Sequence, residues 1–170
     1  MSLVVAACGS SNSNSSASSA AGNAPASGAA SGGAKVSVGT ATGSDGTYLI
    51  GPSGRPVYLW VADGHDKSVC AGACAKVWPP LTSTSAPVAT SGVTASELGT
   101  TTRSGGVKQV TYDGHPLYYF APDTSKGSLT GQGSDSFGAK WWLVAPSGTA
   151  ITKSAAAKPA ASSSSRASGY

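Results

Sequence analysis

The chain has 170 residues, of which 39 % are hydrophobic and 11 % are charged, well below the roughly 25 % of charged residues in an average soluble protein. Its length fits one domain or two small ones, and no apolar run approaches the roughly 18 residues that a membrane-spanning helix needs. The net charge of +4 comes mostly from residues 153–170, which carry three basic residues and no acid, whereas residues 35–152 carry eight basic and seven acidic residues. Because nucleic-acid binding usually depends on a clustered basic face, this nearly neutral body argues against a nucleic-acid partner.

The N-terminal segment has the pattern of a lipid-anchored protein. A short apolar stretch precedes Cys8, and Gly9 and Ser10 follow it. This pattern resembles a bacterial lipobox, in which the cysteine becomes the lipid-modified first residue, so we interpret residues 1–8 as a truncated signal and Cys8 as the attachment site. Residues 9–35 consist almost entirely of Ser, Ala, Gly and Asn, and they are expected to form a disordered tether because they offer too little apolar surface to fold.

The folded domain is expected at residues 36–152, since it contains eleven of the twelve aromatic residues. It begins with a predicted β-hairpin, whose strands at 47–50 and 56–61 are joined by a Gly-Pro-Ser-Gly turn. A helix is expected at 68–77, and it must end there because a Trp-Pro-Pro sequence follows.

The second half of the domain repeats the hairpin. Residues 82–106 are rich in Ser, Thr and Gly and are expected to form a loop around a short element at 95–98. Strands at 108–112 and 116–120 then flank an Asp-Gly dipeptide, which favours a type I′ turn with positive φ at both central residues.

A third hairpin closes the domain. Its strands at 140–144 and 149–151 are joined by a turn similar to that of the first hairpin. Residues 153–170 are expected to be a disordered tail. The predicted fold class is therefore mainly β, a single small domain of two related hairpin repeats with a closing hairpin and one short helix, flanked by disordered tails.

The two hairpins share a sequence pattern. Segments 54–63 and 114–123 both read G-x-P-[VL]-Y-x-[WF]-x-x-D and lie sixty residues apart, which indicates duplication of one structural unit. Strand alternation places Tyr58 and Trp60 on one face and the intervening residues on the other. Both faces are apolar, so the strand is expected to lie between two packed layers.

These segments resemble a family of secreted-repeat bacterial lipoproteins that is marked by a Yx(FWY)xxD motif. The motif residues are Tyr58, Trp60 and Asp63 in the first copy and Tyr118, Phe120 and Asp123 in the second. The flanking sequences, Cys-Ala-Gly-Ala-Cys before Trp-Pro-Pro-Leu and the later Trp-Trp-Leu-Val, are similar as well. The family contains cell-envelope lipoproteins of unknown function, so the resemblance implies a location and an architecture but no activity.

Two cysteines of the domain have a spacing that suits a disulfide. Cys70 and Cys74 are four residues apart, which on a helix separates their Cα atoms by roughly 6 Å, within the span of a disulfide. Disulfides persist in exported proteins, so we expect a structural bond here. The alternative is a metal or redox site, in which His65, Cys70 and Cys74 would supply imidazole and thiolate ligands.

The aspartates of the motif also have two interpretations. Asp63 and Asp123 each follow a strand, where a carboxylate commonly binds backbone N–H groups two residues on and fixes a turn. Otherwise they would form a glycosidase-like carboxylate pair or bind calcium. The aromatic residues of the motif are expected in the core, because so small a β domain needs large buried side chains, although they would also suit a sugar or peptide groove.

No catalytic residue is predicted, because the sequence contains no nucleophile elbow, phosphate-binding glycine loop or haem-attachment motif. We therefore expect a non-enzymatic binding or display module of the cell envelope, without a cofactor and anchored by lipid to the outer face of the cytoplasmic membrane or to the cell surface. Its expected partners are the membrane and an envelope ligand or protein. The alternatives are a redox or metal-handling protein and a carbohydrate-acting enzyme that uses Asp63 and Asp123.

Overall fold

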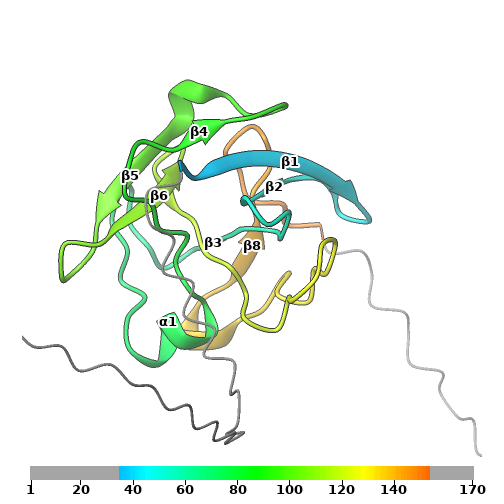
Figure 1. Cartoon of the computed structure of the whole chain (residues 1–170). Coiled ribbons are helices and arrows are strands. Elements are labelled where there is room, and N and C mark those ends of the chain that lie inside the picture. The colour runs from blue at the N-terminus through cyan, green and yellow to red at the C-terminus, as the bar shows by residue number, and fades with distance from the viewer. Residues whose placement is uncertain (1–34, 154–170) are drawn as a thin grey trace, which may run out of the picture. The chain divides into compact units, whose positions relative to one another are not determined.

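A computed structural model describes residues 35–153, which form mainly β-structure with one short α-helix (Figure 1). The strands are β1 Ser37–Gly43, β2 Gly46–Ile50, β3 Tyr58–Trp60, β4 Val88–Ala89, β5 Leu98–Thr102, β6 Lys108–Tyr112, β7 His115–Pro116 and β8 Trp141–Leu143. The helical elements are α1 Ala73–Val77 and two 3-10 turns, η1 Ala95–Glu97 and η2 Ser136–Gly138. The expected fold class is confirmed.

None of the helices in residues 35–153 has the length and apolar character needed to cross a membrane. The lipobox at Cys8, and nearly all of the expected tether at 9–35 and tail at 153–170, lie outside the described residues.

The strands form three small sheets. β1 lies between β2 and β4, antiparallel to β2 and parallel to β4. β6 lies between β5 and β7, antiparallel to both. β3 pairs antiparallel with β8, from Tyr58 opposite Leu143 to Trp60 opposite Trp141. This last pair joins strands that are far apart in the chain and so connects the first repeat to the second.

The two repeats interlock instead of folding separately. Tyr58 and Tyr118, one from each repeat, exchange both backbone hydrogen bonds at 2.8 and 2.9 Å. Two further backbone hydrogen bonds, both 2.8 Å long, connect the repeats. Leu49 N–H of β2 donates to Val144 O, which follows β8, and Val110 N–H of β6 donates to Leu81 O, which follows α1. Each repeat therefore supplies backbone partners that the other lacks.

The third hairpin is confirmed, whereas the second forms at its turn but not along the expected strand at 116–120, because β7 His115–Pro116 is short and Tyr118 pairs with Tyr58 instead. β6 turns into β7 through Asp113 and Gly114, whose φ angles of 48° and 73° are both positive, as the predicted turn requires. In the closing hairpin, Ala145 N–H donates to Thr149 O at 2.9 Å around Gly148.

The first hairpin forms only at its turn. Gly51 N–H donates to Arg55 O at 3.0 Å, and Ile50 bridges to Pro56. The expected second strand at 56–61 then leaves β2, and its continuation β3 pairs with β8 instead. All three residues of β3 are buried, so this strand gains more by lying in the centre of the domain than by extending a hairpin at its edge.

The expected helix at 68–77 is wrong at its start. The helix α1 begins at Ala73, because Gly72 has a φ of 56°, outside the right-handed helical region. Cys70 therefore precedes the helix and does not share a helical face with Cys74.

The expectation for 82–106 is also wrong in part, because this segment contains β4 and β5 as well as η1. β1 was absent from the sequence-based elements altogether. These strands consist largely of Thr, Gly, Ser and Ala, so their own side chains give little strand signal and their pairing with β2 and β6 decides their structure.

The core consists of two apolar clusters, which lie on opposite faces of β3 and contain alternate residues of its strand. Val57 and Leu59 belong to one cluster, and Tyr58 and Trp60 belong to the other. In the second repeat, Leu117 belongs to the first cluster and Tyr118 to the second. The predicted alternation, with both faces of the strand buried, is confirmed.

Candidate functional site

The tyrosine and the aspartate of each motif copy bind to the other copy. The Tyr58 hydroxyl donates to Asp123 Oδ2 at 2.5 Å, and the Tyr118 hydroxyl donates to Asp63 Oδ2. Both tyrosines are completely buried. We call these contacts the crossed Tyr–Asp pairs. They connect the beginning of one motif copy to the end of the other, so the motif fastens the two repeats together.

The same tight turn carries both aspartates. Asp63 N–H donates to Trp60 O at 3.1 Å, and Asp123 N–H donates to Phe120 O at 3.0 Å. Each strand thus ends in a turn that brings its carboxylate to the tyrosine of the other repeat.

The expectation that each carboxylate binds an N–H two residues on is wrong in its spacing. Asp63 Oδ1 accepts from the Val69 N–H at 2.8 Å, six residues on. Asp123 Oδ1 accepts from the Thr130 N–H at 3.0 Å, seven residues on. Each carboxylate therefore closes a longer loop in addition to binding the opposite repeat.

Asp123 is more deeply buried than Asp63, with 0 % of its surface exposed. Besides Tyr58, it accepts hydrogen bonds from the Ser128 hydroxyl at 2.9 Å and from both the N–H and the hydroxyl of Thr130. These donors satisfy the carboxylate without solvent. Its burial counts against a glycosidase-like pair with Asp63, because a catalytic carboxylate must reach both the sugar and water.

Burial also controls the protonation of the crossed Tyr–Asp pairs. It raises the pKa of Tyr58 and Tyr118 above the usual value of 10.0, and the hydrogen bonds to the carboxylates raise it further. Burial raises the pKa of Asp63 as well, although the hydrogen bond from Tyr118 and the nearby Arg103 act in the opposite direction. The phenols therefore keep their protons, and remain donors, to high pH.

Cys70 and Cys74 form a disulfide, with their Cα atoms 5.3 Å apart, and both are buried. The bond confirms the expected pairing and leaves neither sulfur as a free thiolate. His65 is 77 % exposed, and its Nδ1 lies 3.1 Å from Asp66 Oδ2. Within residues 35–153, no three His, Cys, Asp or Glu side chains gather in a way that could hold a metal ion. The structure thus does not assemble the ligand set of His65, Cys70 and Cys74.

Arg103 connects the disulfide loop to one of the crossed Tyr–Asp pairs, and the sequence analysis missed it. Its guanidinium donates to Cys70 O, to the Ser68 hydroxyl at 2.5 Å and to Gln109 Oε1 at 2.6 Å. The Ser68 hydroxyl lies 2.6 Å from the Tyr118 hydroxyl. The only signal in the sequence is that Arg103 is the single basic residue in the Ser-, Thr- and Gly-rich stretch at 82–106.

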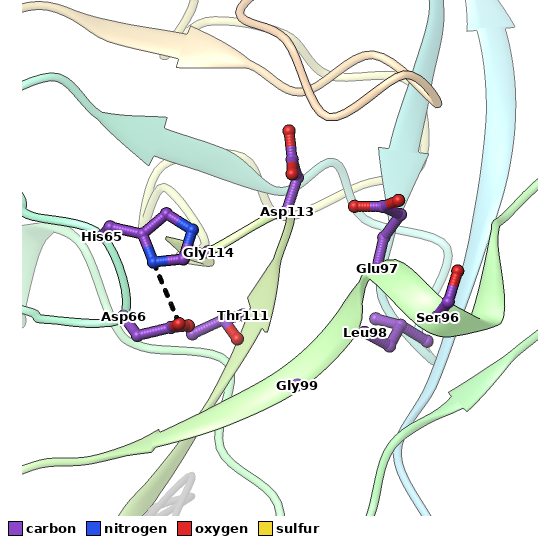
Figure 2. A pocket seen from close by; sticks show the side chains of 9 residues that line it. All are labelled: His65, Asp66, Ser96, Glu97, Leu98, Gly99, Thr111, Asp113 and Gly114. Carbon is purple, nitrogen blue, oxygen red and sulfur yellow. Dashed lines mark ion pairs between the residues drawn. The ribbon is translucent and has the colours of Figure 1, made fainter.

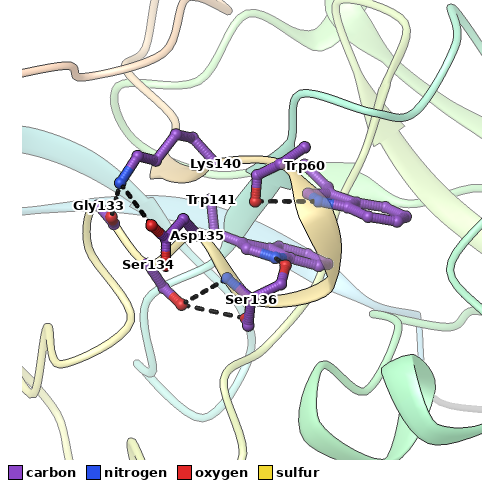
Figure 3. Close-up of polar contacts among 8 residues, drawn as sticks. Trp60, Gly133, Ser134, Asp135, Ser136, Lys140 and Trp141 are labelled. Atoms are coloured by element: carbon purple, nitrogen blue, oxygen red, sulfur yellow. Dashed lines mark hydrogen bonds and ion pairs between the residues drawn. The ribbon is translucent and has the colours of Figure 1, made fainter.

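Three tryptophans stack in parallel in the second core cluster. Trp141 lies between Trp60 and Trp78, with ring centroids 5.1 and 3.9 Å apart and interplanar angles of 6° and 1°. Their indole N–H groups have partners: Trp60 donates to Ala139 O at 3.3 Å and Trp141 donates to Ser136 O at 2.9 Å (Figure 3). Trp78 donates to the Ser136 hydroxyl at 3.0 Å. All three side chains are buried, so they belong to the core and do not line a sugar groove.

An open cleft of about 270 Å³ lies where the loop after β3 meets the β6–β7 turn (Figure 2). Its side chains include His65 and the carboxylates of Asp66, Glu97 and Asp113. Backbone hydrogen bonds hold its edges, from Asp66 N–H to Gly114 O at 2.7 Å and from Asp113 N–H to Glu97 O at 2.9 Å. These residues lie far apart in the chain, so no local pattern in the sequence announces the cleft.

Comparison with known proteins gives one match. Residues 39–82 and 99–145 match the profile of a family described as a secreted repeat of unknown function. The chain belongs to this family of secreted repeats. No curated protein and no solved structure matches the chain.

Each of the two matched stretches of the secreted repeat contains one complete copy of the motif. Each contains one tyrosine and one aspartate of the crossed Tyr–Asp pairs, so these pairs connect one family repeat to the next. The match confirms the resemblance seen in the sequence, and its description supports export of the protein.

Proposed function

We propose that this secreted-repeat protein is a non-enzymatic binding module of the bacterial cell envelope, held at the outer face of the membrane by lipid on Cys8. Its role is to present a rigid domain away from the membrane on the tether at 9–35. Its partners are the membrane, through the anchor, and a ligand or protein of the envelope. The proposal includes no nucleic-acid partner and no cofactor.

The main support for this proposal is that the residues of the motif bind one another inside the domain. Both tyrosines and both aspartates are committed to the crossed Tyr–Asp pairs, and Asp123 and the tyrosines are buried. The tyrosines and aspartates of the repeated motif thus hold the fold together and are not presented to a substrate. The disulfide agrees with an oxidising compartment outside the cytoplasm.

The anchor is supported by the lipobox-like sequence that ends in Cys8 and by the family's description as secreted. It is tested by metabolic labelling of the full chain in its bacterial host with an alkyne fatty acid. We expect label on the wild type in the membrane fraction, and loss of both label and membrane association in Cys8→Ser. The matched control Ser16→Ala should behave as wild type. Equal labelling of Cys8→Ser would overturn the anchor.

The non-enzymatic role is tested by screening the purified full chain for turnover of envelope polysaccharides and peptides. We expect none above the level of a heat-unfolded sample. Specific turnover that Asp63→Asn abolishes, in a variant that still folds, would overturn the role.

The absence of a cofactor is tested on the same protein by native mass spectrometry. We expect a mass gain of about 2 Da when a reductant opens the single disulfide, and no change with a chelator. A metal that leaves with the chelator would overturn the proposal in favour of a metal-handling protein.

A further inference from the structure

The backbone contacts between the two repeats come in equivalent pairs. Leu49 N–H donates to Val144 O at 2.8 Å. Val110 N–H donates to Leu81 O at 2.8 Å as well. Leu49 and Val110 hold equivalent places, because the C=O of each accepts from the N–H of the residue before the motif tyrosine. The contact therefore has a counterpart in which the repeats exchange roles, as in the isologous interface of a twofold dimer.

The equivalent contacts continue to the ends of the motif strands. Val61 N–H donates to Lys140 O at 3.0 Å. In the second repeat, Ala121 N–H donates to Val77 O at 2.9 Å. The crossed Tyr–Asp pairs have the same form in side chains, since each tyrosine binds the aspartate of the other repeat. The two motif tyrosines also bond directly to each other through the backbone, as residues beside a twofold axis do.

Two equivalent tryptophans lie face to face inside this interface. Trp78 directly follows Val77 and Trp141 directly follows Lys140, so the two tryptophans hold equivalent places. Their ring centroids are 3.9 Å apart, the angle between the ring planes is 1°, and both side chains are fully buried. A side chain that stacks on its own counterpart needs no second kind of surface. The buried face of a repeat is therefore complementary to a copy of itself.

The connection between the repeats contains a turn. The chain crosses from one repeat to the other between β4 and β5, because β4 pairs with β1 and β5 pairs with β6. In this connection, Val93 N–H donates to Thr90 O at 3.1 Å, and we call residues 90–93 the hinge. Gly92 is exposed and has a φ of 81°, which favours glycine. Because the hinge lies between the two strand pairs, it can extend without breaking either.

We propose that this chain binds a second copy of itself by exchanging repeats, so that the first repeat of each chain pairs with the second repeat of the other. The exchanged dimer re-forms the contacts described above between chains, and only the hinge changes its conformation. In a free chain, the short connection favours pairing within the chain, because it keeps the repeats at a high effective concentration. Lipid anchoring confines many copies to one surface, which raises their concentration and favours exchange. The inference rests on the proposed binding role and names its partner.

The hinge tests the exchange in the unlipidated full chain, with Cys8→Ser to prevent disulfides between chains. Gly92→Pro removes the positive φ and extends the hinge, since proline fixes φ at about −65°. After refolding from urea, we expect light scattering on a sizing column to show a dimer share at least about tenfold above that of the Cys8→Ser chain. The control Gly105→Pro alters a φ of 83° in the β5–β6 turn, which lies within one repeat, and should remain monomeric.

Two damaged chains test whether the intact repeats recognise each other. Trp78→Ala damages the first repeat and Trp141→Ala the second, because each removes a fully buried ring. Each chain keeps one intact repeat, and these two repeats can pair only if the chains exchange. Refolded together in equal amounts, the variants should gain a dimer mass and an unfolding transition at the wild-type urea midpoint. Either variant alone at the same total concentration is the matched control and should show only its own lower midpoint.

A mixture that unfolds as the sum of its two variants would overturn the inference, as would a Gly92→Pro chain with no more dimer than Gly105→Pro. The mixing experiment keeps the natural hinge, so it decides the question even if Gly92→Pro does not fold. Failure of exchange would leave the proposed function standing, because membrane anchoring and lack of turnover are measured separately.

Discussion

The two repeats bind each other through the same interaction, a crossed Tyr–Asp pair, and differ in the residues around it. In both, a strand carries a buried tyrosine, a tight turn follows, and an aspartate reaches the tyrosine of the other repeat. The partners of the aspartates differ, since Asp123 has four donors and full burial whereas Asp63 keeps some exposure. The first repeat adds a disulfide next to α1, and the described part of the second has none.

The loops after the two motif copies differ most at their surface. His65 packs on Gly114 in one place, and Lys126 packs on Gly54 in the corresponding place of the other repeat. The first loop therefore helps to form an acidic cleft, and the second presents a basic side chain. The comparison teaches that the interlocking interior constrains both copies, while the exposed loops are free to acquire different chemistry.

The largest expected effect tests whether the two repeats contribute equally to the interior. Tyr58→Ala and Tyr118→Ala should each lower the free energy of unfolding by about 3–5 kcal/mol, because each removes a fully buried ring. Urea unfolding of the full chain measures both, and the corresponding Phe variants isolate the smaller loss of the hydroxyl. A near-wild-type unfolding midpoint for either Ala variant would contradict the interlocked arrangement.

The aspartates should show the difference between the repeats. Asp123→Ala is expected to cost about 3 kcal/mol, because it leaves several buried donors without an acceptor. Asp63→Ala should cost only about 1 kcal/mol, since its surroundings are partly open to water. The same unfolding measurement applies to both. Equal losses would mean that the burial of Asp123 has no energetic consequence.

Opening the disulfide should have an intermediate effect. Its five-residue loop is short, so the chain-entropy model gives a loss of about 2 kcal/mol on reduction. We expect a reductant to lower the unfolding midpoint of the wild type and to leave that of the Cys70→Ala/Cys74→Ala double variant unchanged. If the reductant lowered both midpoints equally, the disulfide would not be the cause.

The smallest effect appears only at high pH. The folded-state pKa of Tyr58 and Tyr118 is raised above the unfolded value of 10.0, so their contribution to stability is fully present below pH 10 and is lost as the pH rises above it. Each tyrosine should lower the unfolding free energy by about 1 kcal/mol per pH unit in that range. The double variant Tyr58→Phe/Tyr118→Phe should show a shallower decline between pH 10 and 11.5. Burial also raises the pKa of Tyr119, so Tyr119→Phe should flatten the decline by one site only, less than the double variant does. An unchanged slope in the double variant would contradict the prediction.

Local features were predictable because their causes are local. The Asp113-Gly114 turn needs positive φ at two adjacent residues, and this dipeptide accommodates them. The disulfide joins residues four apart, so the distance was set within a few residues even though Cys70 lies outside α1. The alternation of the motif strand predicted its two buried faces, because neighbouring side chains of a strand point in opposite directions.

The sequence-based interpretation of the site was less successful. It identified the motif residues, but it assigned the carboxylates to turns two residues away and did not connect either one to a tyrosine. The acidic cleft and Arg103 were missed, because their partners lie on loops and strands distant in the sequence. Residue type and spacing carry no information about which distant segment will lie opposite.

The sequence by itself indicated a duplicated, mainly β secreted repeat, with two cysteines spaced for a disulfide and a lipobox-like N-terminus. Only the tertiary structure decided that the repeats exchange partners, that each tyrosine binds the aspartate of the other copy, and that one loop completes an acidic cleft. The physical reason is burial: a strand that is apolar on both faces must lie between layers. In this domain, those layers come from the other repeat.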